Sequence, residues 1–151
     1  SNNTKPSQIY ASDYGLDMRF ANAGMFGTGI YFANNSHYSR SYEHKATNVL
    51  GSDGQQHATA YQMFFCLVAT GESVSLSPTK LQVPPLKSEH PNELRFSNTE
   101  DYRARLGGLE PSHSDNLAAA ERFDSVSNKS NSHYIIYDFN KQYPAYLVTY
   151  I

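Results

Sequence analysis

The residues best suited to chemistry lie in a glycine-rich stretch and in the aromatic segment that follows it. Three glycines within residues 24–29 lead into the apolar run Ile30–Ala33, which contains Tyr31, and Ser39 and Tyr42 follow. Tyrosine rings can stack on a flat aromatic ligand, and a serine hydroxyl can donate to an amide carbonyl. Glycines let the backbone approach such a ligand closely. The pattern therefore indicates a site for a flat aromatic ligand.

A purely structural interpretation fits the same residues. Tyr31 and Phe32 would be core residues of a strand, and Tyr38 and Tyr42 would pack together on one face of a helix because they are four residues apart. The residue pattern alone leaves both interpretations open.

Several other kinds of site are excluded by the sequence. The glycines have the wrong spacing for a dinucleotide fingerprint, and neither a phosphate-binding loop nor a hydrolase elbow is present. The six histidines lack ligand spacing and Cys66 is the single cysteine, so we expect no metal site and no intrachain disulfide. The single cysteine favours a reducing intracellular compartment, nuclear or cytoplasmic.

Length, charge and hydropathy limit the architecture. The 151 residues predict one domain. A net charge of −2 gives no electrostatic footprint for nucleic acid, so we expect no direct nucleic-acid binding. The longest apolar stretch, Met63–Ala69, is far shorter than the ~20 residues that span a bilayer, so we expect no membrane association. The start at Ser1, without Met or a hydrophobic leader, predicts a processed product or a fragment.

Short strands and one helix predict an α+β fold. Residues 88–120 are polar and interrupted by glycine and proline, so we expect a long surface insertion that covers an acceptor site, binds a partner or is disordered. The expected elements are strands at Ile30–Ala33, Tyr61–Val68 (with a continuation to Val74–Leu76), Tyr134–Tyr137 and Ala145–Ile151, a helix at His37–Asn48 capped by Asn34–Ser36, and a helical turn at Asn116–Arg122.

The block Gly24–Ala33, followed by Tyr38-Ser39 and Tyr42, resembles the signature of the poly(ADP-ribose) polymerase family of diphtheria-toxin-like ADP-ribosyltransferases. Four further blocks agree in order and type: Gly15–Phe20, Pro84–Lys87 with Arg122–Val126, Tyr134–Asp138, and Tyr143–Tyr150. The resemblance implies the ADP-ribosyltransferase fold, with two packed, mostly antiparallel β-sheets and few helices. Residues 1–151 would be the C-terminal part of the catalytic domain, with the insertion at 88–120.

The resemblance also implies roles for individual residues. Tyr31 would stack on the nicotinamide ring of NAD and form the middle of a His-Tyr-Glu triad. Ser39 would hydrogen-bond the nicotinamide amide, and Tyr42 would stack on the other face of the ring. Phe32 and Ala33 would line the pocket floor. NAD would be the substrate, and no metal would be needed.

Two departures from the family pattern affect the expected activity. No His-Gly pair is present and no histidine precedes His37, so we expect an N-terminal truncation or, alternatively, degeneration. His133 stands where the triad has its glutamate, and family members without this glutamate transfer a single ADP-ribose or are inactive. A neutral His133 could accept a hydrogen bond, whereas an imidazolium would repel the positive charge that develops on the ribose. Alternatively, His133 is a half-buried strand residue without a role.

The resemblance therefore implies an NAD-dependent protein ADP-ribosyltransferase of the mono-transferase kind, in which Gly15–Gly27 would be the donor loop that closes over NAD. Its partners would be protein acceptor substrates. The alternative is a catalytically inactive module that binds a protein, NAD or ADP-ribose. The altered His133 position and the missing His-Gly pair favour that alternative, whereas the retained Tyr31, Ser39 and Tyr42 favour the enzyme.

Overall fold

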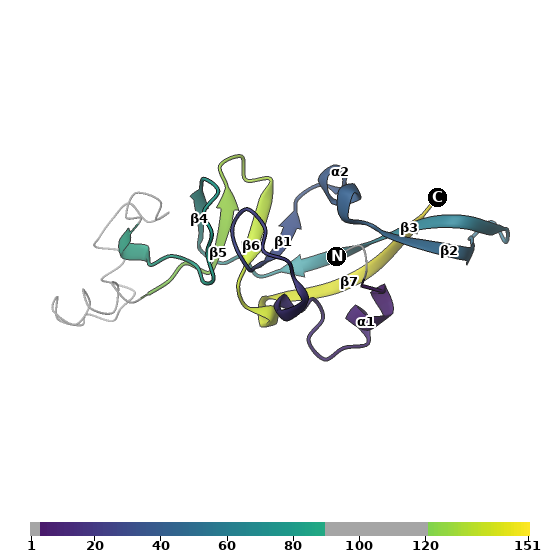
Figure 1. The fold of residues 1–151 in the computed structure, drawn as a ribbon, viewed down its shortest axis with the longest axis horizontal. Coiled ribbons are helices and arrows are strands. Elements are labelled where there is room, and N and C mark those ends of the chain that lie inside the picture. The colour runs from purple at the N-terminus through teal and green to yellow at the C-terminus, as the bar shows by residue number, and fades with distance from the viewer. Residues whose placement is uncertain (1–3, 90–120) are drawn as a thin grey trace.

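The strands of the chain form two separate sheets in a computed structural model that describes residues 4–89 and 121–151 (Figure 1). The four-stranded sheet has the order β1-β6-β5-β4, and the three-stranded sheet has the order β2-β3-β7. All ladders are antiparallel except β4–β5. The predicted α+β class, with two mostly antiparallel sheets and few helices, is confirmed. The strands are β1 (Ile30–Ala33), β2 (His44–Leu50), β3 (Gln56–Val68), β4 (Ser73–Leu76), β5 (Ser125–Asn128), β6 (His133–Ile136) and β7 (Gln142–Tyr150).

The helical elements are short. Within residues 4–89 and 121–151, two are α-helices, α1 (Pro6–Tyr10) and α2 (Ser36–Ser39), and the others are single 3₁₀ turns: η1 (Met18–Phe20), η2 (Arg40–Tyr42), η3 (Lys87–Glu89) and η5 (Phe139–Lys141). No helix among the described residues is long and apolar enough to cross a membrane.

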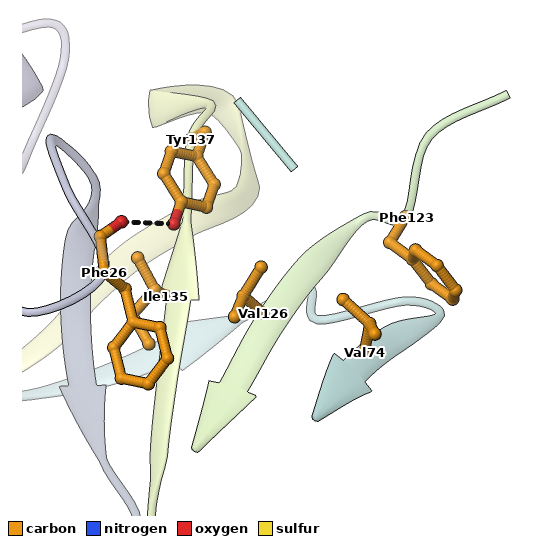
Figure 2. Close-up of a cluster of buried hydrophobic side chains, with 6 residues drawn as sticks. All are labelled: Phe26, Val74, Phe123, Val126, Ile135 and Tyr137. Carbon is orange, nitrogen blue, oxygen red and sulfur yellow. Dashed lines mark hydrogen bonds between the residues drawn. The ribbon is translucent and has the colours of Figure 1, made fainter. Parts of the chain in front are cut away.

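One row of side chains crosses the whole four-stranded sheet and forms the centre of the core. Val74 lies opposite Val126, Val126 opposite Ile135, and Ile135 opposite Tyr31, so all four share one face. The two valines and Ile135 are completely buried. Complete burial of each such side chain stabilises the fold by about 1.5–3 kcal/mol. Figure 2 shows Val74, Val126 and Ile135 of this row together with the buried aromatic side chains of Phe26, Phe123 and Tyr137.

The helix predicted over His37–Asn48 is wrong beyond Tyr42. The predicted cap is present, because the side chain of Asn35 accepts a 3.3 Å hydrogen bond from the backbone N–H of Tyr38. After η2, however, the chain becomes β2 and pairs along its length with β3. Long-range pairing overrides local helix propensity here, and the β-branched residues of this segment fit the strand.

The strand predicted at Tyr61–Val68 exists as the longer β3, but it is not buried as expected. Phe65 and Leu67 are each 59% exposed, whereas Ala60 is completely buried. The predicted continuation to β4 is also wrong. Gly71, with a φ of +53°, turns the chain between the two strands, and β4 belongs to the other sheet.

The C-terminal strands agree with prediction to within a few residues. β6 begins one residue earlier than expected, and β7 begins at Gln142, so Pro144 lies inside the strand rather than before it. Pro144 is tolerated there because the β3–β7 register shifts at its partner Cys66. β5 was not predicted, because its Ser-Val-Ser-Asn sequence lacks a hydrophobic run.

The described residues on either side of segment 90–120 lie against each other. The backbone N–H of Lys87 donates to the carbonyl oxygen of Glu121 at 2.8 Å, and Leu86 forms a β-bridge with Arg122. The ammonium group of Lys87 is buried between the carboxylates of Glu72 and Glu121. Residues 86–87 and 121–122 are therefore direct neighbours in the fold. The helical turn predicted at Asn116–Arg122 and most of the predicted insertion lie outside the described residues.

Candidate functional site

The glycine-rich stretch forms a tight turn that rests on the tip of Tyr31. Gly24 and Gly27 exchange backbone hydrogen bonds of 2.9 and 3.2 Å. The Tyr31 hydroxyl accepts from the backbone N–H of Phe26 at 2.8 Å and donates to the carbonyl oxygen of Gly27 at 3.0 Å. A Cβ on Gly24 would lie 2.6 Å from Cζ of Tyr31, so only glycine permits this approach. Gly27, with a φ of +86°, adopts a left-handed conformation that favours glycine.

A second tyrosine holds the same turn from the end of β6. The Tyr137 hydroxyl donates to the carbonyl oxygen of Phe26 at 2.7 Å (Figure 2). Burial raises the pKa of both Tyr31 and Tyr137, so both hydroxyls are protonated and neutral at physiological pH. They act as fixed hydrogen-bonding groups rather than as bases.

The two tyrosines that follow β1 form an exposed aromatic pair. The rings of Tyr38 and Tyr42 have centroids 5.6 Å apart and are tilted by 40°, and their hydroxyls lie 3.3 Å apart. This confirms that they share a face. Hydrogen bonding to Tyr42, followed by burial, raises the pKa of the Tyr38 hydroxyl. Tyr42 is 59% exposed, so its ring is open to a flat ligand.

His133 lies beside this pair on the neighbouring strand. Its ring packs edge-on against Tyr38, with centroids 4.0 Å apart. Its Nδ1 lies 2.8 Å from the amide nitrogen of Asn128 and 3.0 Å from the hydroxyl oxygen of Ser132. Its Nε2 is buried and has no hydrogen-bond partner among residues 4–89 and 121–151.

The structure brings three of the six predicted site residues together on one face of the β1–β6 pair. Ala33 lies directly opposite His133, and Tyr31 is two residues away from Ala33, so these three side chains share that face. Phe32 is opposite Tyr134 and points to the other face of the sheet. The side chain of Phe32 is thus separated by the sheet from those of Tyr31, Ala33 and His133.

Ser39 is the last residue of α2, between Tyr38 and the 3₁₀ turn that carries Tyr42. It is half-buried, and its hydroxyl caps none of the backbone N–H groups of that turn.

Sequence reasoning missed Asn128, which links β5 to His133. The signal was the run of asparagine and serine in residues 128–132, which is typical of a turn between two strands. Asn131 has a φ of +51°, as expected for such a turn.

A cavity of about 370 Å³ lies elsewhere, between the β2–β3 hairpin and the end of β7. It contains none of the predicted site residues. At its edge, Nε2 of His57 lies within hydrogen-bond distance, 3.0 Å, of a carboxylate oxygen of Asp53. The residues that line this cavity are Val49, Leu50, Gly51, Ser52, His57, Ala60, Thr149, Tyr150 and Ile151.

In the part of the chain that the structure describes, no three His, Cys, Asp or Glu side chains are grouped to hold a metal ion.

Comparison with known proteins places the chain in a family. The profile of the poly(ADP-ribose) polymerase catalytic domain matches residues 7–151. A probable poly [ADP-ribose] polymerase from Dictyostelium discoideum is 30% identical over 103 residues, which cover 68% of this chain and 24% of that relative. The chain thus spans about a quarter of the length of the relative it matches. Because the profile covers nearly the whole chain, the chain belongs to the poly(ADP-ribose) polymerase catalytic domain family.

Proposed function

We propose that the protein transfers a single ADP-ribose unit from NAD to a protein side chain, inside the cell in the nucleus or cytoplasm. The observation that carries this proposal is the position of Tyr38, whose ring packs against both His133 and Tyr42, beside the sheet face that carries Tyr31, in a chain of this family. NAD supplies an ADP-ribosyl group joined to nicotinamide, which is the leaving group.

The aromatic residues fit the nicotinamide end of NAD. Tyr31 is held at its hydroxyl by the glycine turn, so its ring keeps one orientation. The exposed ring of Tyr42 offers a second stacking surface, and the Ser39 hydroxyl at the end of α2 would bond the amide. Stacking of this kind contributes about 0.5–1.5 kcal/mol beyond burial. The turn at Gly24–Gly27 would cover the ligand, and orientation of the leaving group would supply part of the rate enhancement.

His133 favours single transfer over polymer formation. It occupies the strand position opposite Ala33 where a glutamate would present a negative charge. An imidazole supplies no negative charge, so it stabilises the positive charge that develops on the ribose far less than a carboxylate does. It is also a poorer partner for a ribose hydroxyl that must attack a second NAD. The product would therefore be one ADP-ribose per site.

A non-catalytic binding module is the second candidate function. The observation that favours it is the position of Tyr38, whose ring packs against His133 while Nε2 of that histidine is buried. With Tyr38 in this position, no ligand reaches that nitrogen. Such a module would bind NAD, ADP-ribose or a protein without turnover.

The experiment uses the full-length protein, incubated with labelled NAD and followed by gel and mass spectrometry. The decisive variant is Tyr42→Ala, because this ring is exposed and its removal leaves the core intact. Tyr134→Phe is the matched control, since Tyr134 lies on the opposite face from Tyr31. One ADP-ribose per site, reduced at least tenfold by Tyr42→Ala and unchanged by the control, supports the proposal. Long polymer contradicts it, and NAD binding without label supports the module.

A further inference from the structure

The side chain of Asn128 holds the β5–β6 hairpin and the imidazole of His133 at the same time. Its Oδ1 accepts hydrogen bonds from the backbone N–H groups of Ser132 at 2.9 Å and His133 at 3.0 Å. Because both of these groups only donate, the atom that receives them must be the amide oxygen. The orientation of the amide is thereby fixed, and its Nδ2 faces Nδ1 of His133 at 2.8 Å.

This contact determines which imidazole nitrogen carries the proton. An amide NH₂ group can only donate, so Nδ1 of His133 must accept and cannot be protonated. In the neutral ring the proton then resides on Nε2. The Ser132 hydroxyl oxygen lies 3.0 Å from both Nδ1 of His133 and Nδ2 of Asn128, and it can accept from that amide, so its presence requires no proton on Nδ1. His133 therefore accepts through one ring nitrogen, as the sequence suggested, but its acceptor nitrogen is occupied by Asn128.

The remaining N–H is a buried donor without an acceptor among the described residues. Such a group destabilises a fold unless something pairs with it. It lies on the sheet face that also carries Tyr31 and Ala33. The ring of Tyr38, which packs against the imidazole, is 41% exposed, and its hydroxyl bonds that of the exposed Tyr42. Because both rings lie at the surface, the Tyr38 ring can turn aside without disturbing the core.

We propose that Asn128 is a positioning residue that keeps His133 in its Nε2–H form, and that this N–H donates a hydrogen bond to a ribose hydroxyl oxygen of NAD. The inference rests on the proposed function and specifies how the altered triad position is used. A glutamate there would accept a hydrogen bond from the ribose, whereas His133 donates one. The ribose is still oriented, but no negative charge is supplied.

The first part of the test reads the tautomer directly. In the full-length protein labelled with ¹⁵N-histidine, long-range ¹H–¹⁵N spectra distinguish the two neutral forms, and His133→Gln identifies the signal. Wild type is expected to show Nε2–H. Asn128→Asp replaces the donor by an acceptor, so the proton is expected to move to Nδ1. Ser130→Ala removes another partner of the Asn128 amide, at 2.9 Å, and should leave the imidazole signal unchanged. A protonated Nδ1 in wild type, or an unchanged signal in Asn128→Asp, overturns the proposal.

The second part adds NAD and separates this inference from the proposed function. The Nε2–H signal should shift on NAD addition, and Asn128→Asp should lower the transfer rate about tenfold, which corresponds to one hydrogen bond in the transition state. Ser130→Ala should transfer ADP-ribose at the wild-type rate. NAD binding and transfer with no change at Nε2–H overturns the donor role and leaves the proposed function standing. Absence of NAD binding in calorimetry overturns both, even when the tautomer is as expected.

Discussion

The Tyr137 hydroxyl donates a 2.7 Å hydrogen bond to the carbonyl oxygen of Phe26 and so ties the end of β6 to the glycine turn (Figure 2). The N–H of Phe26 donates to the hydroxyl of Tyr31 at 2.8 Å, so two tyrosines hold this one residue through its backbone. The Phe26 side chain is itself buried in the core. The turn is therefore part of the packed structure at this point, and the candidate site depends on it.

Tyr137→Phe should lower the free energy of unfolding by about 1–2 kcal/mol, because the buried carbonyl of Phe26 loses its hydrogen-bond donor. Urea unfolding of the full-length protein measures this change. Tyr134→Phe is the control, since its hydroxyl makes no hydrogen bond within residues 4–89 and 121–151 and its loss should change stability by less than about 0.5 kcal/mol. Equal effects of the two substitutions would contradict the role given to Tyr137.

Gly24→Ala should weaken NAD binding by displacing Tyr31. The added Cβ would lie 2.6 Å from Cζ and 2.7 Å from the hydroxyl oxygen of that ring, so the ring must move away from its two backbone partners. We expect the dissociation constant for NAD, measured by calorimetry, to rise about tenfold, which corresponds to ~1.4 kcal/mol.

Gly54→Ala provides the matched control for Gly24→Ala. Gly54 has a φ of +75° and no atom within 4 Å of an added Cβ, so the substitution strains the backbone without touching a neighbour. It should lower stability by about 1–2 kcal/mol and leave the NAD affinity unchanged. If both variants weaken NAD binding to the same extent, the effect comes from lost stability and not from Tyr31.

Local patterns predicted the strands around the candidate site well. Patterns only a few residues long were enough to predict the apolar strand β1, the Asn35 cap of α2 and the strands near residues 134 and 145. Side-chain alternation then places Tyr31 and Ala33 on one face. That face becomes a candidate site only because β6 brings His133, 100 positions further along the chain, opposite Ala33. The family resemblance anticipated that these strands meet, whereas the spacing of the residues alone did not.

The errors arise where distant pairing decides the structure. β2 looks like the continuation of a helix until β3 pairs with it, and β5 carries too few apolar residues to be recognised alone. Burial of Ser125 and Ser127 is possible because their hydroxyls bond backbone carbonyls, at 2.8 Å to Thr70 and 3.5 Å to Val74. The role of Asn128 was missed for the same reason, because its bonds exist only once the hairpin has formed.

Asp124 should make stability depend on acid pH. Burial alone would raise the pKa of its carboxyl, but the hydrogen bond from Lys141 at 2.6 Å and that from the backbone N–H of Glu72 at 3.0 Å outweigh it and lower the pKa below 3.8. A carboxyl whose pKa is lower in the folded state stabilises the fold at pH values above its unfolded pKa. That stabilisation is lost as the pH falls below 3.8 through the folded pKa.

Asp124→Asn should therefore flatten the fall of unfolding free energy between pH 5 and pH 2, as measured by urea unfolding. Near neutral pH the substitution should lower stability by about 1 kcal/mol, the magnitude typical of a partly exposed ion pair. Lys141→Met removes the other partner and should have a similar effect, and the double variant should add little to either single change. Additive losses would show that the two side chains do not act as a pair.

Cys66 should react slowly with alkylating reagents while the protein is folded. Burial on β3 raises the pKa of its thiol from 9.0 to about 11, and the reactive species is the thiolate. At pH 8 this difference lowers the thiolate fraction about 100-fold. Iodoacetamide labelling followed by mass spectrometry should therefore be about 100-fold slower in buffer than in concentrated urea. Because Cys66 is the single cysteine of the chain, a Cys66→Ser variant of this segment gives the background directly. Equal rates in buffer and urea would mean that the thiol is exposed in the native protein.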